Sequence, residues 1–251
     1  MVGQRGHNRR HRPRVGAVVH TGRAGHVHRF PDLERRRGPL REFGRRGCSA
    51  PAGRFHNPIP HGRQLMAGKG VRIAGGSARG VPLVEPRGVR LRPTSGLVRE
   101  AVFNILASAV GGARVLDLYA GTGALGIEAL SRGASHATFL EGEAACVEAI
   151  LQSLARAGFS AQATVLRGRL PAALDRIEGT FDLIFMDPPY DDQSKEEVLV
   201  RLSRLLAPGG RIVFEHGSRY NPPVRPEGLQ LLDRRTYGDT AVAFYGHLEG
   251  E

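Results

Sequence analysis

The tetrapeptide Asp187-Pro188-Pro189-Tyr190 combines residue types that can hold a flat group bearing an amine. It directly follows the apolar run 181–186, which is typical of a buried strand, and ligands of open α/β sheets bind at the carboxyl ends of such strands. The prolines fix φ and lack an N–H group, so the loop is stiff. The Asp187 carboxylate and the Pro188 carbonyl accept hydrogen bonds beside the ring of Tyr190. This arrangement suits a planar base that has been withdrawn from its stack, and it makes Asp187, Pro188 and Tyr190 the candidate catalytic residues.

A glycine-rich turn follows an earlier strand pattern. Gly121, Gly123 and Gly126 have the spacing of a dinucleotide site, and Glu141 lies 20 residues beyond Gly121, where a ribose-binding acid is expected. This spacing does not separate a nicotinamide dinucleotide from S-adenosylmethionine, because both ligands need close backbone approach and a carboxylate for the ribose. Asp117 favours the second ligand, since an acid beside the loop repels a pyrophosphate but attracts a cationic amino acid moiety. The tetrapeptide also favours it, because it has no use in hydride transfer.

Strand and helix patterns alternate regularly along the part of the chain that carries these motifs. Strands are expected at 114–118, 137–141, 163–167, 181–186 and 211–215, and helices at 124–131, 143–157, 171–177 and 194–206. The last of these helices is expected to stop at Pro208-Gly209-Gly210. The runs 228–235 and 240–247 surround a Tyr-Gly-Asp turn and predict a hairpin. The fold class is therefore α/β: a doubly wound, Rossmann-like, seven-stranded sheet that ends in an antiparallel pair.

Two smaller features precede this sheet. The runs 71–74 and 81–84 predict a small β unit within 66–94, and Pro82 places the second run at an edge. Ser95 is the expected N-cap of a helix that reaches Val110 and opens the main domain, 95–251.

All of the formal net charge of +12 lies in residues 1–65, which contain 15 arginines, no lysine and three acids. This segment lacks a period of 2 or 3.6, which predicts disorder. Three interpretations remain: an RNA-binding tail, an organellar transit peptide, or translated upstream sequence with Met66 as the true start. The last is favoured because structured sequence begins at Val71.

Cysteine usage and hydropathy limit the remaining classes. Cys48 and Cys146 are the only cysteines, so the sequence shows neither a disulfide framework nor metal-ligand spacing. No apolar run approaches the length that spans a bilayer. We therefore expect a cytoplasmic protein that binds no metal and no membrane.

The motif order resembles the class I S-adenosylmethionine-dependent methyltransferases, and among them those with an (N/D/S)-P-P-(Y/F) motif. Over 71–247 the chain resembles the RsmD family in particular. This resemblance rests on Arg72-Ile73-Ala74-Gly75-Gly76, Arg79-Gly80, Arg92-Pro93-Thr94, Arg99-Glu100, Phe103-Asn104, Tyr237-Gly238-Asp239-Thr240-Ala241 and Phe244-Tyr245. It implies methyl transfer from S-adenosylmethionine to N2 of a guanine in 16S ribosomal RNA.

The chain departs from the family pattern at two places. Ser95-Gly96-Leu97 stands where the family usually carries Thr-Asp-Arg. The third strand usually ends in Asp or Asn for the adenine amino group, whereas here Gly168, Arg169 and Leu170 follow it. Because arginine cannot accept a hydrogen bond, adenine is expected to contact backbone groups of these residues.

The resemblance also implies the binding residues. Those for the cofactor are Asp117, Ala120, Gly121, Gly123, Glu141, Gly168, Arg169, Leu170 and Asp187, with Glu143 as an alternative to Glu141. Those for RNA are Arg72, Arg79, Arg92 and Arg99 as phosphate contacts, with Arg90 nearby and Tyr190 stacked on the base. The expected partner is small-subunit ribosomal RNA or an assembling 30S particle, and the chain is expected to act as a monomer.

Other activities use the same type of motif. A protein glutamine-N5 methyltransferase also needs acceptors before an aromatic residue, but it typically has Asn where this chain has Asp187. An adenine-N6 methyltransferase of DNA or RNA is a further alternative. A non-catalytic RNA-binding protein is disfavoured because Asp117, Gly121, Gly123 and Glu141 are all present.

Overall fold

A seven-stranded sheet with the order β3-β2-β1-β4-β5-β7-β6 forms the centre of the protein in a computed structural model. The structure describes residues 70–89 and 95–248, which belong to one compact unit. Strands β1 to β5 run parallel to one another, and β7 runs antiparallel to both β5 and β6. This order confirms the doubly wound sheet with a C-terminal hairpin. The predictions for residues 1–65, Met66, Arg90 and Arg92 lie outside the described residues.

The elements have the following bounds. The strands are β1 (Arg114–Leu118), β2 (His136–Glu141), β3 (Ala163–Arg167), β4 (Phe181–Met186), β5 (Leu206–Gly217), β6 (Leu229–Tyr237) and β7 (Thr240–His247). The α-helices are α1 (Gly96–Leu106), α2 (Ala124–Ser131), α3 (Ala144–Ala157) and α4 (Lys195–Arg201). Short 3-10 helices cover Ala107–Val110, Ser160–Gln162, Ala172–Arg176 and Ser203–Leu205.

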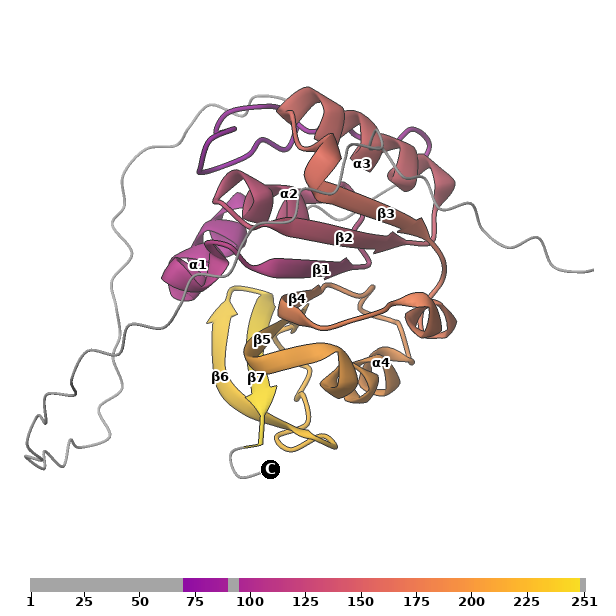
Figure 1. Cartoon of the computed structure of the whole chain (residues 1–251). Helices are drawn as coiled ribbons and strands as arrows, with labels where there is room; N and C mark the ends of the chain where they lie inside the picture. Colours follow the sequence, from indigo (N-terminus) through magenta and orange to yellow (C-terminus); the bar gives the residue numbers. More distant parts are fainter. Residues whose placement is uncertain (1–69, 90–94, 249–251) are drawn as a thin grey trace, which may run out of the picture. The chain divides into compact units, whose positions relative to one another are not determined.

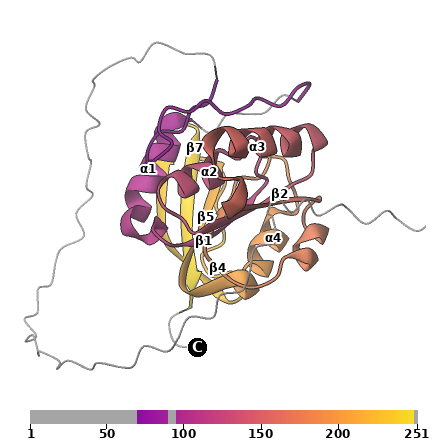
Figure 2. The same cartoon turned by 45° about the horizontal axis from the view of Figure 1, so that its top comes forward.

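Helices cover both faces of the sheet, as Figures 1 and 2 show. Helices α1, α2 and α3 pack on one face, and α4 packs with the 3-10 helix Ala172–Arg176 on the other. The core accordingly has two parts. Phe139 and Phe185 belong to the first and Ile184 and Phe214 to the second, so alternate strand residues point to opposite layers. Both faces are apolar because both are covered.

Two predicted helices differ in the structure. The helix predicted over 194–206 ends its α-helical part at Arg201, and β5 begins at Leu206 instead of 211. Gly209 adopts a positive φ of 75°, and the β4–β5 pairing shifts register between Phe181 and Leu183, so the chain passes Pro208-Gly209-Gly210 within the strand. The helix predicted over 171–177 is a 3-10 helix, Ala172–Arg176.

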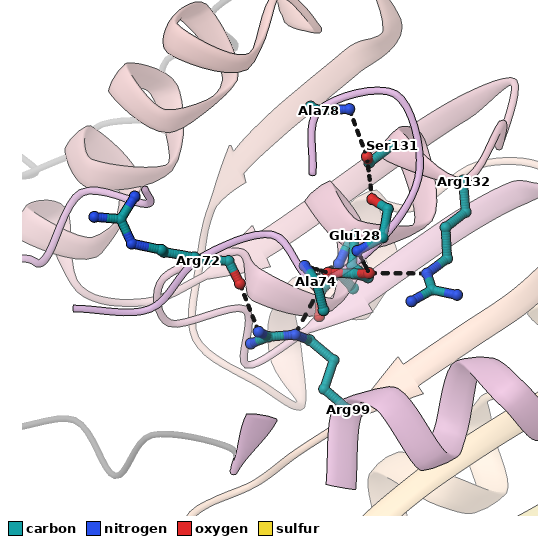
Figure 3. Close-up of polar contacts among 10 residues, drawn as sticks. Arg72, Ala74, Ala78, Arg99, Glu128, Ser131 and Arg132 are labelled. Atoms are coloured by element: carbon teal, nitrogen blue, oxygen red, sulfur yellow. Dashed lines mark hydrogen bonds and ion pairs between the residues drawn. The ribbon is translucent and has the colours of Figure 1, made fainter. Parts of the chain in front are cut away.

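The segment before α1 is tied to helix α2. Its two predicted strands pair only through an isolated bridge between Arg72 and Pro82 among the described residues. The carboxylate of Glu128 accepts hydrogen bonds from the amides of Ala74 (2.7 Å) and Gly75 (2.8 Å), as Figure 3 shows in part. Glu128 is fully buried, so this contact anchors residues 70–89 on the helix that begins at the glycine turn.

Candidate active site

A cavity of about 830 Å³ lies where β1, β2, β3 and β4 end. Most of the predicted cofactor residues line it: Asp117, Ala120, Gly121, Glu141, Gly168, Arg169, Leu170 and Asp187. The predicted catalytic residues Asp187, Pro188 and Tyr190 also line it. Val71, Glu85, Pro86 and Val89 also line it; they belong to the segment before α1, for which the sequence suggested only RNA contact.

The glycine turn has the backbone geometry that its sequence predicts. Gly121 and Gly123 have positive φ angles of 54° and 74°, which L-residues with side chains rarely adopt. The amide of Gly121 donates to Oε2 of Glu141 at 2.8 Å, and the amide of Glu143 donates to Oε1 at 2.8 Å. Glu141 is thereby held at the cavity wall by two backbone donors. Gly123 does not line the cavity; it shapes the turn, since an added Cβ would lie 3.2 Å from Ile127 Cδ1.

Asp117 is the most deeply buried acid at the cavity, with 2% of its surface exposed. The amide of Gly126 donates to its Oδ2 at 2.8 Å, and an added Cβ on Gly126 would lie 2.3 Å from the Phe139 ring. Burial raises the pKa of Asp117 to about 8, and the charges of Asp187 and Glu141 act in the same direction. A cationic ligand in this cavity would favour the ionised form of Asp117.

The loop after β4 is fixed by a residue that the sequence did not single out. The hydroxyl of Tyr119 donates to Oδ2 of Asp192 at 2.7 Å, and the amide of Ser194 donates to Oδ1 at 2.7 Å. Burial acts to raise the pKa of Asp192, but these hydrogen bonds outweigh it and hold the pKa below its usual value. Tyr119 and Asp192 are 73 positions apart, so no local pattern could have paired them.

Lys195 supports the same loop from the start of α4. Its ammonium group donates to the carbonyls of Tyr190 (3.3 Å) and Asp192 (3.0 Å). Tyr190 keeps 43% of its surface exposed, and its hydroxyl lies 3.3 Å from Thr240 Oγ1. The aromatic ring is therefore held at the rim of the cavity, where a flat ligand could reach it.

Glu141 and Glu143, the two candidates for ribose binding, have different side-chain partners near the end of β3. The Arg169 side chain is exposed and forms a 2.8 Å ion pair with Glu143. The amide of Gly168 donates to the Glu141 carbonyl at 2.9 Å. Glu143 is thus engaged with a surface arginine, whereas the Glu141 carboxylate faces the glycine turn.

A second, smaller cavity of about 180 Å³ shares part of its wall with the first. Pro188, Pro189, Tyr190 and Glu215 line both cavities. His216, Gly217, Tyr220 and Lys195 complete the second. The sequence did not predict that Glu215, His216 and Gly217, at the end of β5, line a cavity, because this strand end carries no recognisable motif.

The predicted RNA-contacting arginines have different environments. Arg72 and Arg79 are exposed, although the Arg72 side chain also donates to the Gly80 carbonyl at 2.9 Å. Neither lines the main cavity. Arg99, for which the sequence predicted a phosphate contact, has only 4% of its surface exposed and lines the main cavity.

Arg99 is instead part of a buried ionic group. Its Nε lies 3.5 Å from Glu128, and its guanidinium donates to the Arg72 carbonyl at 2.6 Å (Figure 3). Burial lowers the pKa of Arg99, and the charge of Glu128 opposes this. Arg132, which directly follows α2, approaches the same carboxylate at 2.8 Å. Arg99 therefore links α1, on which it lies, to α2 and to the segment before α1.

Within residues 70–89 and 95–248, no group of three or more His, Cys, Asp or Glu residues could hold a metal ion. No helix in those ranges is both long and apolar enough to cross a bilayer. Cys146 is a buried free thiol at the cavity wall, and its burial raises its pKa to about 11, which makes it a poor nucleophile at neutral pH.

Comparisons with known proteins agree with this geometry. The family model described as Conserved hypothetical protein 95 matches residues 71–246. A Bacillus subtilis (strain 168) protein described as a putative rRNA methyltransferase is 35% identical over 180 residues, which is 70% of this chain and 98% of that protein. Ribosomal RNA small subunit methyltransferase D of Escherichia coli (strain K12) is 35% identical over 179 residues, covering 70% of this chain and 89% of the relative.

Solved structures show the same relationship. A putative methyltransferase from Escherichia coli superposes with a TM-score of 0.64 at 34% identity, covering 70% of this chain and 97% of that chain. A putative methylase from Haemophilus influenzae gives a TM-score of 0.58 at 32% identity, with 71% and 99% covered. The chain therefore belongs to the Conserved hypothetical protein 95 family, that of ribosomal RNA small subunit methyltransferase D, and it has the class I methyltransferase fold.

Proposed function

We propose that this protein transfers a methyl group from S-adenosylmethionine to the exocyclic N2 of a guanine in 16S ribosomal RNA. The observation that carries the proposal is the position of Asp187-Pro188-Pro189-Tyr190. Pro188 to Tyr190 separate a large acidic cavity from a smaller one, and Asp187 lies at the end of β4. The names of the bacterial relatives, which are rRNA methyltransferases, support the same substrate class.

The large cavity has the size and charge that S-adenosylmethionine requires. Its volume of about 830 Å³ is within the usual range for small-molecule sites, which is roughly 300–1,000 Å³. The carboxylates of Glu141 and Asp187 would favour a ligand that carries a sulfonium and an ammonium group, and such a ligand would in turn favour the ionised form of Asp117. We assign Glu141 to the ribose hydroxyls and the backbone of Gly168 to Leu170 to the adenine. The bound ligand supplies an electrophilic methyl carbon.

Asp187 and Pro188 have the main chemical role in this proposal. The lone pair of guanine N2 is delocalised into the ring, so the amine is a poor nucleophile. The Asp187 carboxylate and the Pro188 carbonyl would accept its two N–H bonds and align the lone pair with the methyl carbon. As the N–C bond forms and the bond between the methyl carbon and the sulfonium sulfur breaks, positive charge would grow on N2; the Asp187 carboxylate would stabilise this charge, and N2 would then lose one proton. The base would stack on the ring of Tyr190.

Contact with the RNA backbone is assigned to the exposed arginines before α1. Arg72 and Arg79 lie in the segment whose residues Val71, Glu85 and Val89 line the cavity. Arginine suits phosphate because its forked donors match the phosphate oxygens. We also propose a phosphate contact for Arg92, which lies outside the residues that the structure describes.

The test is methyl transfer from labelled S-adenosylmethionine to three substrates: naked 16S rRNA, assembled small subunits and a ribosomal protein fraction. Digestion of labelled RNA to nucleosides should yield N2-methylguanosine. Label found only in protein, or in N6-methyladenosine, would reject the proposal.

A pair of variants on one loop tests the assignment of Asp187. Asp187→Ala should abolish methyl transfer, whereas binding of S-adenosylmethionine, measured by calorimetry, should weaken but remain detectable. Asp191→Ala removes an exposed carboxylate four residues further along and should behave like the unaltered protein. Near-normal turnover of Asp187→Ala would remove Asp187 from the mechanism.

A further inference from the structure

The smaller cavity contains a histidine whose protonation pattern can be derived. His216 is the penultimate residue of β5 and has 3% of its surface exposed, and its Nδ1 lies 2.8 Å from the Gly217 carbonyl oxygen. A carbonyl only accepts hydrogen bonds, so Nδ1 must carry the proton. In the neutral ring Nε2 is then an acceptor. This buried Nε2 has no hydrogen-bond partner among the residues that the structure describes.

The environment keeps the ring neutral and fixes its direction. Burial lowers the pKa of His216; the hydrogen bond to Gly217 opposes this, and the charge of Arg234 lowers it further. The ring packs against Phe214 and Tyr220, with centroid separations of 5.2 and 5.4 Å. A buried acceptor that is held in place and has no partner is costly, so a ligand that brings a hydrogen-bond donor would be stabilised there.

The position of the cavity indicates which ligand would bring this donor. His216 lines the cavity together with Pro188 and Tyr190, which form part of the proposed amine-binding corner. Lys195, whose ammonium group is 4.9 Å from the centroid of the Tyr220 ring, lies at the same cavity. If a base stacks on Tyr190 and places its amine at Pro188, the ring edge next to that amine would lie close to His216 on β5, because all three residues line the same cavity.

We propose that Nε2 of His216 accepts a hydrogen bond from N1–H of the target base and thereby selects guanine. The inference rests on the proposed function, because it requires a base amine at Asp187 and Pro188. Guanine carries an N1–H donor beside N2, whereas N1 of adenine is itself an acceptor. A base with an acceptor at that position would leave two lone pairs facing each other, and polar mismatches of this kind discriminate strongly.

Three RNA probes separate the two base contacts. They are single-stranded uridine-rich oligomers that carry guanine, inosine or 2-aminopurine at one central position. Inosine keeps N1–H but lacks the amine, and 2-aminopurine keeps the amine but lacks N1–H. The full chain, saturated with S-adenosylhomocysteine, should bind the guanine oligomer about tenfold more tightly than the 2-aminopurine oligomer, as one hydrogen bond allows.

Two substitutions at His216 form a matched pair. In His216→Asn the amide nitrogen still donates to the Gly217 carbonyl, but the acceptor at Nε2 is lost. In His216→Gln an amide oxygen can take the place of Nε2. We expect His216→Asn to bind guanine and 2-aminopurine oligomers equally, and His216→Gln to keep most of the preference. His136→Asn is the control, because this histidine begins β2 at the opposite end of the strands and contacts Thr164.

A persistent tenfold guanine preference in His216→Asn would overturn the inference, as would equal binding of guanine and 2-aminopurine by the unaltered protein. The nucleoside analysis of 16S rRNA tests the proposed function separately. If the unaltered protein makes N2-methylguanosine while His216→Asn keeps the preference, only the histidine assignment fails. If no N2-methylguanosine forms, the proposed function itself fails.

Discussion

The hydroxyl of Tyr119 donates a 2.7 Å hydrogen bond to Oδ2 of Asp192 and joins the end of β1 to the loop that follows Tyr190. Tyr119 has a positive φ of 55°, which is unusual for a residue with a side chain. Such backbone strain costs about 1–3 kcal/mol and persists where the surroundings enforce it. The glycine turn and the Asp187 loop therefore meet through one fixed contact. In the proposed function, this contact would hold the binding sites for the methyl donor and for the base that accepts the methyl group in a fixed relative position.

Removing this hydroxyl should lower turnover more than it lowers stability. Tyr119→Phe keeps the ring and loses the hydrogen bond, so we expect kcat to fall about fivefold, since one such bond contributes roughly 1 kcal/mol. Tyr245→Phe is the matched control, because its hydroxyl donates to the Pro223 carbonyl at 2.8 Å and this residue lines neither cavity. Steady-state kinetics on rRNA compare the two. An equal fall in kcat for both variants would show that the Tyr119 contact has no special role.

The buried carboxylate of Glu128 should be essential for docking the segment before α1. Glu128→Gln leaves Arg99 and Arg132 facing a neutral amide, and removal of one partner of a buried pair costs about 3–5 kcal/mol. We expect the midpoint of urea unfolding to fall, and hydrogen exchange at Ala74 and Gly75 to accelerate. Glu148→Gln on α3 is the control, because its exposed side chain bonds only Gln152 among the hydrogen bonds of the described residues. Unchanged exchange at Ala74 would contradict this role.

Asp117 should make stability depend on pH. Its carboxyl has a pKa of about 8 in the folded protein, raised by burial from the ordinary value of 3.8 that applies to the unfolded chain. Between these values the folded state binds a proton that the unfolded state has released, so stability should decrease as pH rises from 4 to 8. Asp117→Asn cannot titrate and should show a flatter slope. Urea unfolding at pH 5 and pH 8 measures this, with Asp191→Asn as an exposed control. Equal slopes for Asp117→Asn and the unaltered protein would contradict the shift.

Exposed Arg79 should contribute a phosphate contact that depends on salt. Arg79→Gln is expected to weaken RNA binding equally for all sequences and to reduce the slope of log K against log salt by about one. Arg114→Gln is the control, because Arg114 begins β1 at the opposite end of the strands from the cavity. Fluorescence anisotropy with a 16S rRNA fragment at several salt concentrations gives the slopes. If both variants lower the slope alike, the contact is not localised before α1.

Local sequence patterns were enough to predict the sheet and most of the residues that line the main cavity. The bounds of β1, β3, β4 and α2 agree with the predictions, because apolar runs and glycine turns are local signals. Asp117 and Glu141 lie near the ends of β1 and β2, Gly121 and Asp187 follow β1 and β4, and parallel strands bring their carboxyl ends to one edge. Residues of the candidate site could therefore be predicted wherever a sequence motif coincides with the end of a strand.

The contacts between distant segments depend on how the elements pack, so the sequence did not predict them. The charge of Arg99 suggested a surface role, but its place between α1 and α2 buries it against Glu128. Tyr119 meets Asp192, and His216 reaches the loop of Tyr190, only because β4 lies between β1 and β5 in the sheet order. Residue type and spacing along the chain do not encode which strands become neighbours. Packing of the apolar layers decides that, and it places each polar side chain either in solvent, in the core or at a cavity wall.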